Sequence, residues 1–229
     1  MSENILKKII VNKTSKINEL KKKINIESLK EKINKNKTFL NFKNKILNNA
    51  NNNKATCLSV LTEEDFFLGN LIHINKIKEK INLPILCKDF FIDKFQVHLA
   101  KSYGADAILI ILAAINDKLA DELYEEAIKL NMTVIVEVHT EDEAKKSLKF
   151  KEALIGINNR NLKTLKTNIN TTYDICNVLA KHSSSLISES GIKTKEELLE
   201  INKKTNIKSF LIGESLLKNL DKNSIFSLL

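Results

Sequence analysis

The chain has 229 residues, of which 43% are hydrophobic and 28% are charged, with a formal net charge of +9. This length and hydrophobic content suffice for one large domain with a substantial core, and they exclude an intrinsically disordered chain. The longest apolar stretch, residues 107–115, falls far short of the roughly 20 residues of a membrane helix, so we expect no membrane association. The N-terminus also lacks the apolar core of a signal peptide.

The excess positive charge lies in the first quarter of the chain. Residues 1–54 contain 14 lysines and 4 glutamates, whereas the remaining residues are close to neutral. Nucleic-acid binding is one interpretation, but a stacking platform needs aromatic residues among the cations, and only Phe39 and Phe42 are present. We therefore interpret the lysines as solvated helix faces and predict no nucleic-acid partner. Apolar residues at helical spacing predict two basic amphipathic helices within residues 1–36.

From residue 55 onward, apolar strands alternate with polar amphipathic segments. Strand candidates begin near residues 57, 84, 107, 133, 154, 185 and 209. The helix candidates are residues 70–81, 93–103, 116–130, 140–149, 170–181 and 194–204. This alternation predicts a parallel sheet, and about 25 residues per strand matches one unit of a (β/α)8 barrel.

A parallel sheet of this kind forms either a closed barrel or an open doubly wound sheet. The first strand is not followed by a GxGxxG motif, which disfavours the dinucleotide-binding sheet. Polar residues at nearly every strand end favour the barrel, where such residues form the active site. We therefore predict an α/β, TIM-type barrel over residues 55–229, preceded by a basic helical extension and an Asn-rich linker over residues 1–54.

The cysteines and histidines carry no recognisable motif. Cys57, Cys87 and Cys176 are odd in number and too scattered for a zinc site, so we predict reduced thiols, a cytoplasmic protein and no metal. The four histidines also form no motif, and a structural or surface role is expected for each.

Lys88 and Glu137 are the first candidates for chemistry, because each continues an apolar strand. If Glu137 faces the barrel interior, burial raises its pKa, and a nearby lysine lowers it again. Such a pair suits proton transfer near neutral pH, with the lysine as acid. A structural ion pair is the alternative. Asp89 points to the face opposite Lys88 and is expected to orient the structure.

Arg160 is the only arginine among 37 basic residues, and it follows Asn158 and Asn159 after a strand. Its planar guanidinium matches a carboxylate or a phosphate in a way that lysine cannot reproduce. This favours a role in substrate binding over the alternative, an arginine on a surface loop that has no function.

Small residues end the last two strands, at Ser190 and Gly191 and again from Gly213 to Ser215. They allow backbone N–H groups to approach an anion, and a phosphate site at this position recurs in barrels. Three aromatic residues lie just beyond strand ends: Phe66, Phe67 and Phe90. Their rings either contact an aromatic substrate or pack in the core.

Taken in chain order, a set of motifs resembles the indole-3-glycerol-phosphate synthase family from about residue 55 to the C-terminus. The motifs are SVLTEEDFF (59–67), PILCKDFFID (84–93), ADAILIILAA (105–114), VEVHTEDE (136–143), IGINNRNL (155–162), SESGI (188–192) and FLIGESLL (210–217). The helical N-terminal segment is also similar to that family's N-terminal extension.

The resemblance implies a TIM barrel of tryptophan biosynthesis that works without cofactor or metal. It implies conversion of 1-(o-carboxyphenylamino)-1-deoxyribulose 5-phosphate to indole-3-glycerol phosphate by ring closure, decarboxylation and dehydration. It implies a monomer that can associate with other enzymes of the pathway.

The same resemblance assigns roles to individual residues. It implies Lys88 as general acid, Glu137 as its acid–base partner, and Asn158 and Arg160 as ligands of substrate hydroxyls and carboxylate. Further residues are implied in binding: Glu189 in the polar network, Phe67 and Phe90 beside the substrate, and Ser190, Gly191, Gly213 and Ser215 at the phosphate.

The sequence departs from the family pattern before the SVLT strand. Relatives carry there a first strand with a Glu-x-Lys pair, a phosphate-binding loop and a helix, whereas this chain has a polar tract, NNANNNK, at 48–54. Seven strands do not fit the usual barrel closure. Three interpretations stay open: an internally deleted enzyme with little activity, a substitute strand from residues 38–46 carrying Lys43 or Lys45, or a phosphate-binding pseudoenzyme.

Overall fold

The structure, a computed structural model, describes residues 5–36, 39–48, 55–180, 182–183 and 185–218. It divides into two compact units. The first comprises residues up to 45 together with 57–135, and the second comprises residues 46–56 together with those from 136 onward. The boundary falls inside strand β4 (Thr133–Val138).

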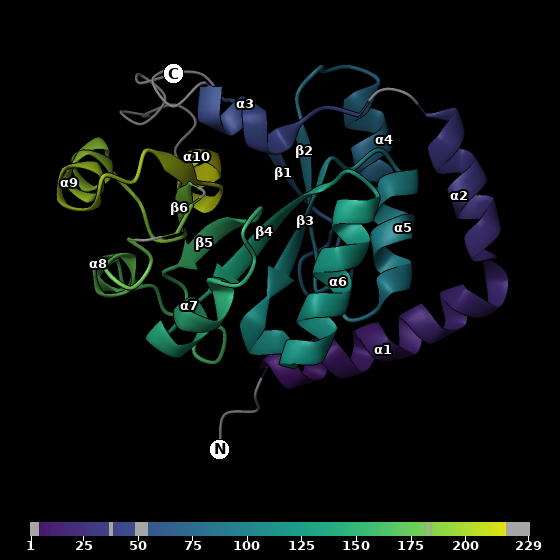
Figure 1. The fold of residues 1–229 in the computed structure, drawn as a ribbon, viewed down its shortest axis with the longest axis horizontal. Coiled ribbons are helices and arrows are strands. Elements are labelled where there is room, and N and C mark those ends of the chain that lie inside the picture. The colour runs from purple at the N-terminus through teal and green to yellow at the C-terminus, as the bar shows by residue number, and fades with distance from the viewer. Residues whose placement is uncertain (1–4, 37–38, 49–54, 181, 184, 219–229) are drawn as a thin grey trace. The chain divides into compact units, whose positions relative to one another are not determined.

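The first unit begins with helices and continues as alternating strands and helices (Figure 1). Its helices are α1 (Ile5–Lys23), α2 (Ile26–Lys35), α3 (Phe42–Asn48, which crosses the boundary), α4 (Ile72–Lys78), α5 (Lys94–Ser102), the 3-10 turn Leu112–Ala114 and α6 (Asp117–Lys129). Its complete strands are β1 (Leu58–Leu61), β2 (Ile85–Lys88) and β3 (Ala107–Ile111). β1 pairs with β2 and β2 with β3, in both cases parallel.

The predicted basic helices are confirmed as α1 and α2. The apolar residues of α1 recur on one side of the helix, and Leu6, Ile9 and Ile17 are buried. Ile17 and Leu29 pack against α5 in a small apolar cluster with Phe95 and Leu99. Burial of this stripe anchors the N-terminal helices to the first unit.

Residues 42–48 form a helix, which contradicts one of the three open interpretations, the substitute strand, over residues 42–46. A hydrogen bond to a side chain far along the chain and one buried aromatic ring explain the outcome. The backbone N–H of Lys43 donates to Oγ1 of Thr133 at 3.1 Å, and Phe42 is buried. Lys43 and Lys45 therefore lie on α3 rather than in a sheet. Residues 37–38 and the tract 49–54 lie outside the described residues.

The second unit continues the same alternation after the end of β4. Its helices are α7 (Glu141–Ser147), α8 (Asn170–Cys176), α9 (Lys195–Thr205) and α10 (Glu214–Lys218), and its strands are β5 (Leu154–Asn158), β6 (Leu186–Glu189) and β7 (Ser209–Leu211). Parallel pairing of β5 with β6 sets Asn158 opposite Glu189, the last residue of each strand. Pairing of β6 with β7 sets Glu189 opposite Leu211. Polar residues therefore stand side by side at the carboxyl ends of β5 and β6.

The predicted strands are all present in the described residues, and each begins within one residue of its expected start. Helix starts follow local capping: Asp93 and Thr194 form capping boxes with Gln96 and Glu197 at α5 and α9. Several helices are shorter than their periodic patterns, and α8 ends at Cys176. Among the residues that the structure describes, no helix is long and apolar enough to cross a membrane.

Candidate active site

Glu137 is a buried carboxylate one residue before the end of β4. Its side chain is 2% exposed, and it lies between Val136 and Val138, which face the other side of the strand. Asn158, at the end of β5, donates its Nδ2–H to Oε1 of Glu137 at 3.0 Å. The second unit thus brings together two of the residues that the sequence predicts for the site.

His139 is a neighbour of this site that sequence reasoning did not single out. Its Nε2 lies 3.2 Å from Oε1 of Glu137, an ion-pair distance, although the N–H is not aligned for a hydrogen bond. Its Nδ1 lies 3.3 Å from Oε2 of Glu143 in α7. Burial lowers the pKa of His139, but the two carboxylates outweigh it and raise the pKa to about 9. The Glu-Val-His spacing was the available signal, since residues two apart share one face of a strand.

Arg160 lies two residues beyond the end of β5 and is already engaged in the protein. One guanidinium nitrogen lies 2.7 Å from Oε2 of Glu214 in α10, and the other donates to the carbonyl of Leu165 at 3.1 Å. Its backbone N–H donates to Oδ1 of Asn158 at 2.9 Å. The side chain is 31% exposed, so an incoming anion can reach it and share the guanidinium with Glu214.

The turn after β6 adopts a left-handed backbone at two successive residues, Ser190 with φ 64° and Gly191 with φ 78°. Asn159 holds this turn by donating Nδ2–H to the carbonyl of Ser190 at 3.1 Å and to Oγ of Ser188 at 3.2 Å. The amide oxygen of Asn159 accepts from Thr172 of α8, from both its backbone N–H and its hydroxyl. This fully bonded network fixes the backbone at the predicted phosphate turn.

The remaining second-unit candidates differ in their surroundings. Glu189 is fully buried at the end of β6, in register with Asn158. Gly213 precedes α10 in open space, where an added Cβ meets nothing within 4 Å. The hydroxyl of Ser215 donates to the carbonyl of Ile192 at 2.6 Å, so its hydrogen is used inside the protein.

In the first unit, Lys88 is the last residue of β2 and is partly buried. The next residue, Asp89, is buried and accepts a hydrogen bond from the Thr62 hydroxyl at 2.8 Å. Lys13 of α1 reaches the same carboxylate, with Nζ 2.6 Å from Oδ1. Burial raises the pKa of Asp89, and Lys13 opposes that effect. These contacts agree with the expected structural role of Asp89.

The aromatic candidates also lie in the first unit. The ring centroids of Phe67 and Phe90 are 6.2 Å apart, and Phe67 is 42% exposed whereas Phe90 is 6% exposed. Phe90 therefore packs in the core, and Phe67 keeps a ring face available. Phe66 is 40% exposed.

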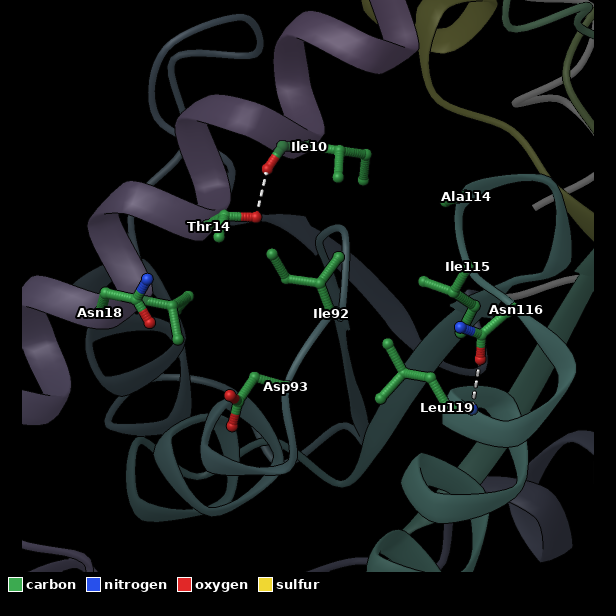
Figure 2. A pocket seen from close by; sticks show the side chains of 10 residues that line it. Ile10, Thr14, Asn18, Ile92, Asp93, Ala114, Ile115, Asn116 and Leu119 are labelled. Atoms are coloured by element: carbon green, nitrogen blue, oxygen red, sulfur yellow. Dashed lines mark hydrogen bonds between the residues drawn. The ribbon is translucent and has the colours of Figure 1, made fainter.

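A cavity of about 320 Å³ lies between α1 and the segments after β2 and β3 (Figure 2). It is lined by Ile10, Thr14, Ile17, Asn18, Ile92, Asp93, Ala114, Ile115, Asn116 and Leu119. None of the predicted site residues lines it. Over the described part of the chain, no group of three or more His, Cys, Asp or Glu residues is arranged to hold a metal ion.

Parallel strands alternating with helices, with charged and amide side chains at the carboxyl ends of the strands, define a protein of the (β/α)-barrel class. A model of the indole-3-glycerol phosphate synthase family matches residues 48–228. The chain belongs to the indole-3-glycerol phosphate synthase family.

Relatives agree with this family. The chain is 40% identical to the tryptophan biosynthesis protein TrpCF of Buchnera aphidicola subsp. Acyrthosiphon pisum, over 95% of the chain and 53% of that protein. It is 40% identical to indole-3-glycerol phosphate synthase of Burkholderia ambifaria over 72% of the chain and 62% of that protein, and 43% identical to that of Hyphomonas neptunium over 72% and 61%. The chain thus spans about half to three fifths of the length of these relatives.

Solved structures with low sequence identity show the fold. One is 3-keto-L-gulonate-6-phosphate decarboxylase from Vibrio cholerae, with a TM-score of 0.54 and 18% identity over 69% of this chain and 76% of that chain. Another is phosphoribosylanthranilate isomerase from Thermotoga maritima, with a TM-score of 0.55 and 10% identity over 83% and 91%. Together with the family, they confirm the predicted barrel-type fold.

The alignment with the Buchnera TrpCF protein covers 245 positions, more than the 229 residues of the chain. Because it uses 95% of the chain, about 218 residues, about 27 positions have no residue in this chain. That number is close to one strand-helix unit. The alignment with the TrpCF protein of Buchnera aphidicola subsp. Schizaphis graminum covers 177 positions and uses 76% of the chain, about 174 residues. In that alignment almost every position has a residue in this chain.

Proposed function

We propose that the chain catalyses the formation of indole-3-glycerol phosphate from 1-(o-carboxyphenylamino)-1-deoxyribulose 5-phosphate in tryptophan biosynthesis. The observation that carries the proposal is the buried contact between Glu137 and Asn158, with Arg160 bonded to the same asparagine. The names of the relatives support the same reaction. The ligand is a phosphorylated small molecule, and a cytoplasmic monomer remains our expectation.

In this reaction a ring carbon bonds to the ribulose carbonyl carbon, carbon dioxide leaves, and water is then eliminated. Lys88 supplies the proton that the carbonyl oxygen needs when the ring closes. After it regains a proton from solvent, it supplies the proton that the departing hydroxyl needs. Glu137 accepts the proton released as the double bond forms. A buried carboxylate is suited to this role because little water competes for it.

Binding groups account for the two charged ends of the substrate. Arg160 binds the carboxylate, for which its planar fork is matched, and Asn158 binds a hydroxyl. Ser190 and Gly191 offer backbone N–H groups to the phosphate, and Gly213, after β7, and Ser215, in α10, contribute from the other side. Glu189 belongs to the polar network, and the exposed ring of Phe67, backed by Phe90, covers the aromatic part.

The test is a turnover assay on the purified chain, following the appearance of indole fluorescence. We expect product from the wild type and a loss of about 100-fold or more in Lys88→Ala, the usual effect of removing a general acid. Lys80→Ala is the matched control, because Lys80 is an exposed lysine. No product above the blank from the wild type would reject the proposal.

A second candidate is a non-catalytic member of the family that binds phosphate ligands without turnover. It is favoured by the alignment positions that have no counterpart in the chain. A variant with a family-like first strand and helix inserted between Asn48 and Ala55 separates the two candidates. Turnover by the inserted variant alone, with phosphate-ligand binding by both proteins, would support the second candidate.

A further inference from the structure

The imidazole of His139 lies between two carboxylates at the end of β4. Nε2 lies 3.2 Å from Oε1 of Glu137, and Nδ1 lies 3.3 Å from Oε2 of Glu143. The backbone N–H of His139 also donates to Oε2 of Glu143, at 2.7 Å. The side chains of His139 and Glu137 are 11% and 2% exposed. Little solvent therefore separates these charges.

Carboxylates on both sides favour a positively charged ring, through a hydrogen bond at Nδ1 and an ion-pair distance at Nε2. A neutral imidazole has one donor and one acceptor, so it would set a lone pair against one carboxylate, whereas an imidazolium presents an N–H and a positive charge to both. The charged groups facing the ring are Glu137 from β4 and Glu143 from α7, and Asn158 of β5 contributes a neutral amide to Glu137.

The same contacts restrict the carboxylate of Glu137. Its Oε1 receives the Asn158 amide at 3.0 Å and faces the imidazole Nε2. Contacts from two sides limit rotation of the carboxylate, and the adjacent positive charge favours its ionised form. Glu143 is held in turn, because its backbone N–H bonds to the hydroxyl of Thr140, the N-cap of α7.

We propose that His139 is a positioning residue for the base Glu137, acting as an imidazolium that Glu143 anchors. This role rests on the proposed function, because it concerns the group that accepts a proton in that reaction. Glu143 acts one step further away, by orienting the ring.

The first test is steady-state kinetics of the full chain with the carboxyphenylamino-deoxyribulose phosphate substrate. We expect kcat to fall about 10-fold in His139→Gln, which keeps a neutral donor, and about 100-fold in His139→Ala, with KM nearly unchanged. In His139→Gln the acidic limb of the kcat/KM profile moves to higher pH, because a positive charge beside the carboxylate is lost. A purely structural role would not move that limb. His73→Gln is the control, since His73 is exposed.

The second measurement needs no turnover. Nitrogen NMR of the imidazole at pH 7.5 should show both ring nitrogens of His139 protonated in the wild type, and Glu143→Gln should lower the pH at which the ring loses its proton. A neutral ring at that pH would overturn the inference, as would wild-type kcat and an unshifted pH profile in folded His139→Gln. If the His139 ring is charged but the wild type shows no turnover, the proposed function is rejected. The contacts of His139 with Glu137 and Glu143 are then structural ion pairs only.

Discussion

Lys13 of α1 forms a buried ion pair with Asp89, the residue directly after the proposed acid Lys88. Nζ and Oδ1 are 2.6 Å apart, and the side chains are 7% and 9% exposed. Two more lysines of the same helix pair with acidic residues after β1 and β2: Lys16 with Glu64 and Asp65, and Lys21 with Asp93. The interpretation of the N-terminal lysines as solvated is therefore wrong for Lys13, because its charge is neutralised inside the first unit.

Replacing Lys13 with methionine should lower the free energy of unfolding by about 3–5 kcal/mol, because it leaves Asp89 buried without its cation. Urea unfolding at pH 7 measures the change. Lys22→Met is the matched control on an exposed position of the same helix, and we expect it to stay within about 0.5 kcal/mol of wild type. In the double variant Lys13→Met, Asp89→Asn, the loss should be smaller than the sum of the single losses. Additive losses would show that the two groups do not interact.

The stability of the second unit should depend on pH through His139. The pKa of His139 is about 9 in the folded protein, whereas the ordinary histidine value of 6.5 applies to the unfolded chain. The folded state therefore holds the proton more tightly. The resulting stabilisation is fully present below pH 6.5 and is lost as pH rises through about 9. Since one pKa unit corresponds to about 1.4 kcal/mol, we expect a loss of roughly 1–3 kcal/mol across this window. Comparing urea unfolding of wild type and His139→Asn at pH 6 and 9.5 isolates this effect, and equal pH dependence of the two proteins would contradict it.

Gly191→Ala should lower the free energy of unfolding by about 1–3 kcal/mol. The residue has φ 78°, and an added Cβ would come within 3.0 Å of Cβ of Thr167. Gly213→Ala tests the same chemical change where an added Cβ meets nothing within 4 Å, and we expect little change there. Thermal or urea unfolding of both variants decides the point. Equal stability of the two variants would show that the turn after β6 is not conformationally demanding.

Arg160→Lys should raise KM about 10-fold and change kcat little, because lysine keeps the charge but loses the planar fork. Substrate titration in the indole fluorescence assay gives both constants. Lys163→Arg, at an exposed lysine of the same loop, serves as the comparison, for which both constants should match wild type. An unchanged KM in Arg160→Lys would remove this residue from substrate binding.

Sequence reasoning was most successful where periodic apolar residues determine local structure. Strand starts such as Ala107, Thr133 and Leu154 were predicted to the residue, because a buried parallel strand is a continuous apolar run. It left a substitute strand open at residues 42–46, where the structure has a helix in which Phe42 is buried and which side chains of distant residues hold in place. Thr133, 90 residues away, provides one of those bonds.

The candidate site shows the same division. Glu137 could be proposed from the sequence because it lies within an apolar run, and Asn158 because of the family motif that contains Arg160. The tertiary structure adds the 3.0 Å contact between them. The role of Lys13 could not be predicted in this way, because a lysine in a basic helix looks solvated until folding brings Asp89 beside it. For His139 the Glu-Val-His spacing was a signal, but the structure was needed to show the contacts of the ring with Glu137 and Glu143.

The sequence alone determined the alternation of strands and helices, the positions of the polar strand ends and the resemblance to a family, since these depend on local periodicity and motif order. Only the tertiary structure decided which charges are paired: Lys13 with Asp89, His139 with Glu137 and Glu143, and Arg160 with Glu214. The physical reason is that burial and pairing depend on distances between residues far apart in the chain, such as positions 13 and 89. Those distances exist only once the strands and helices are packed together.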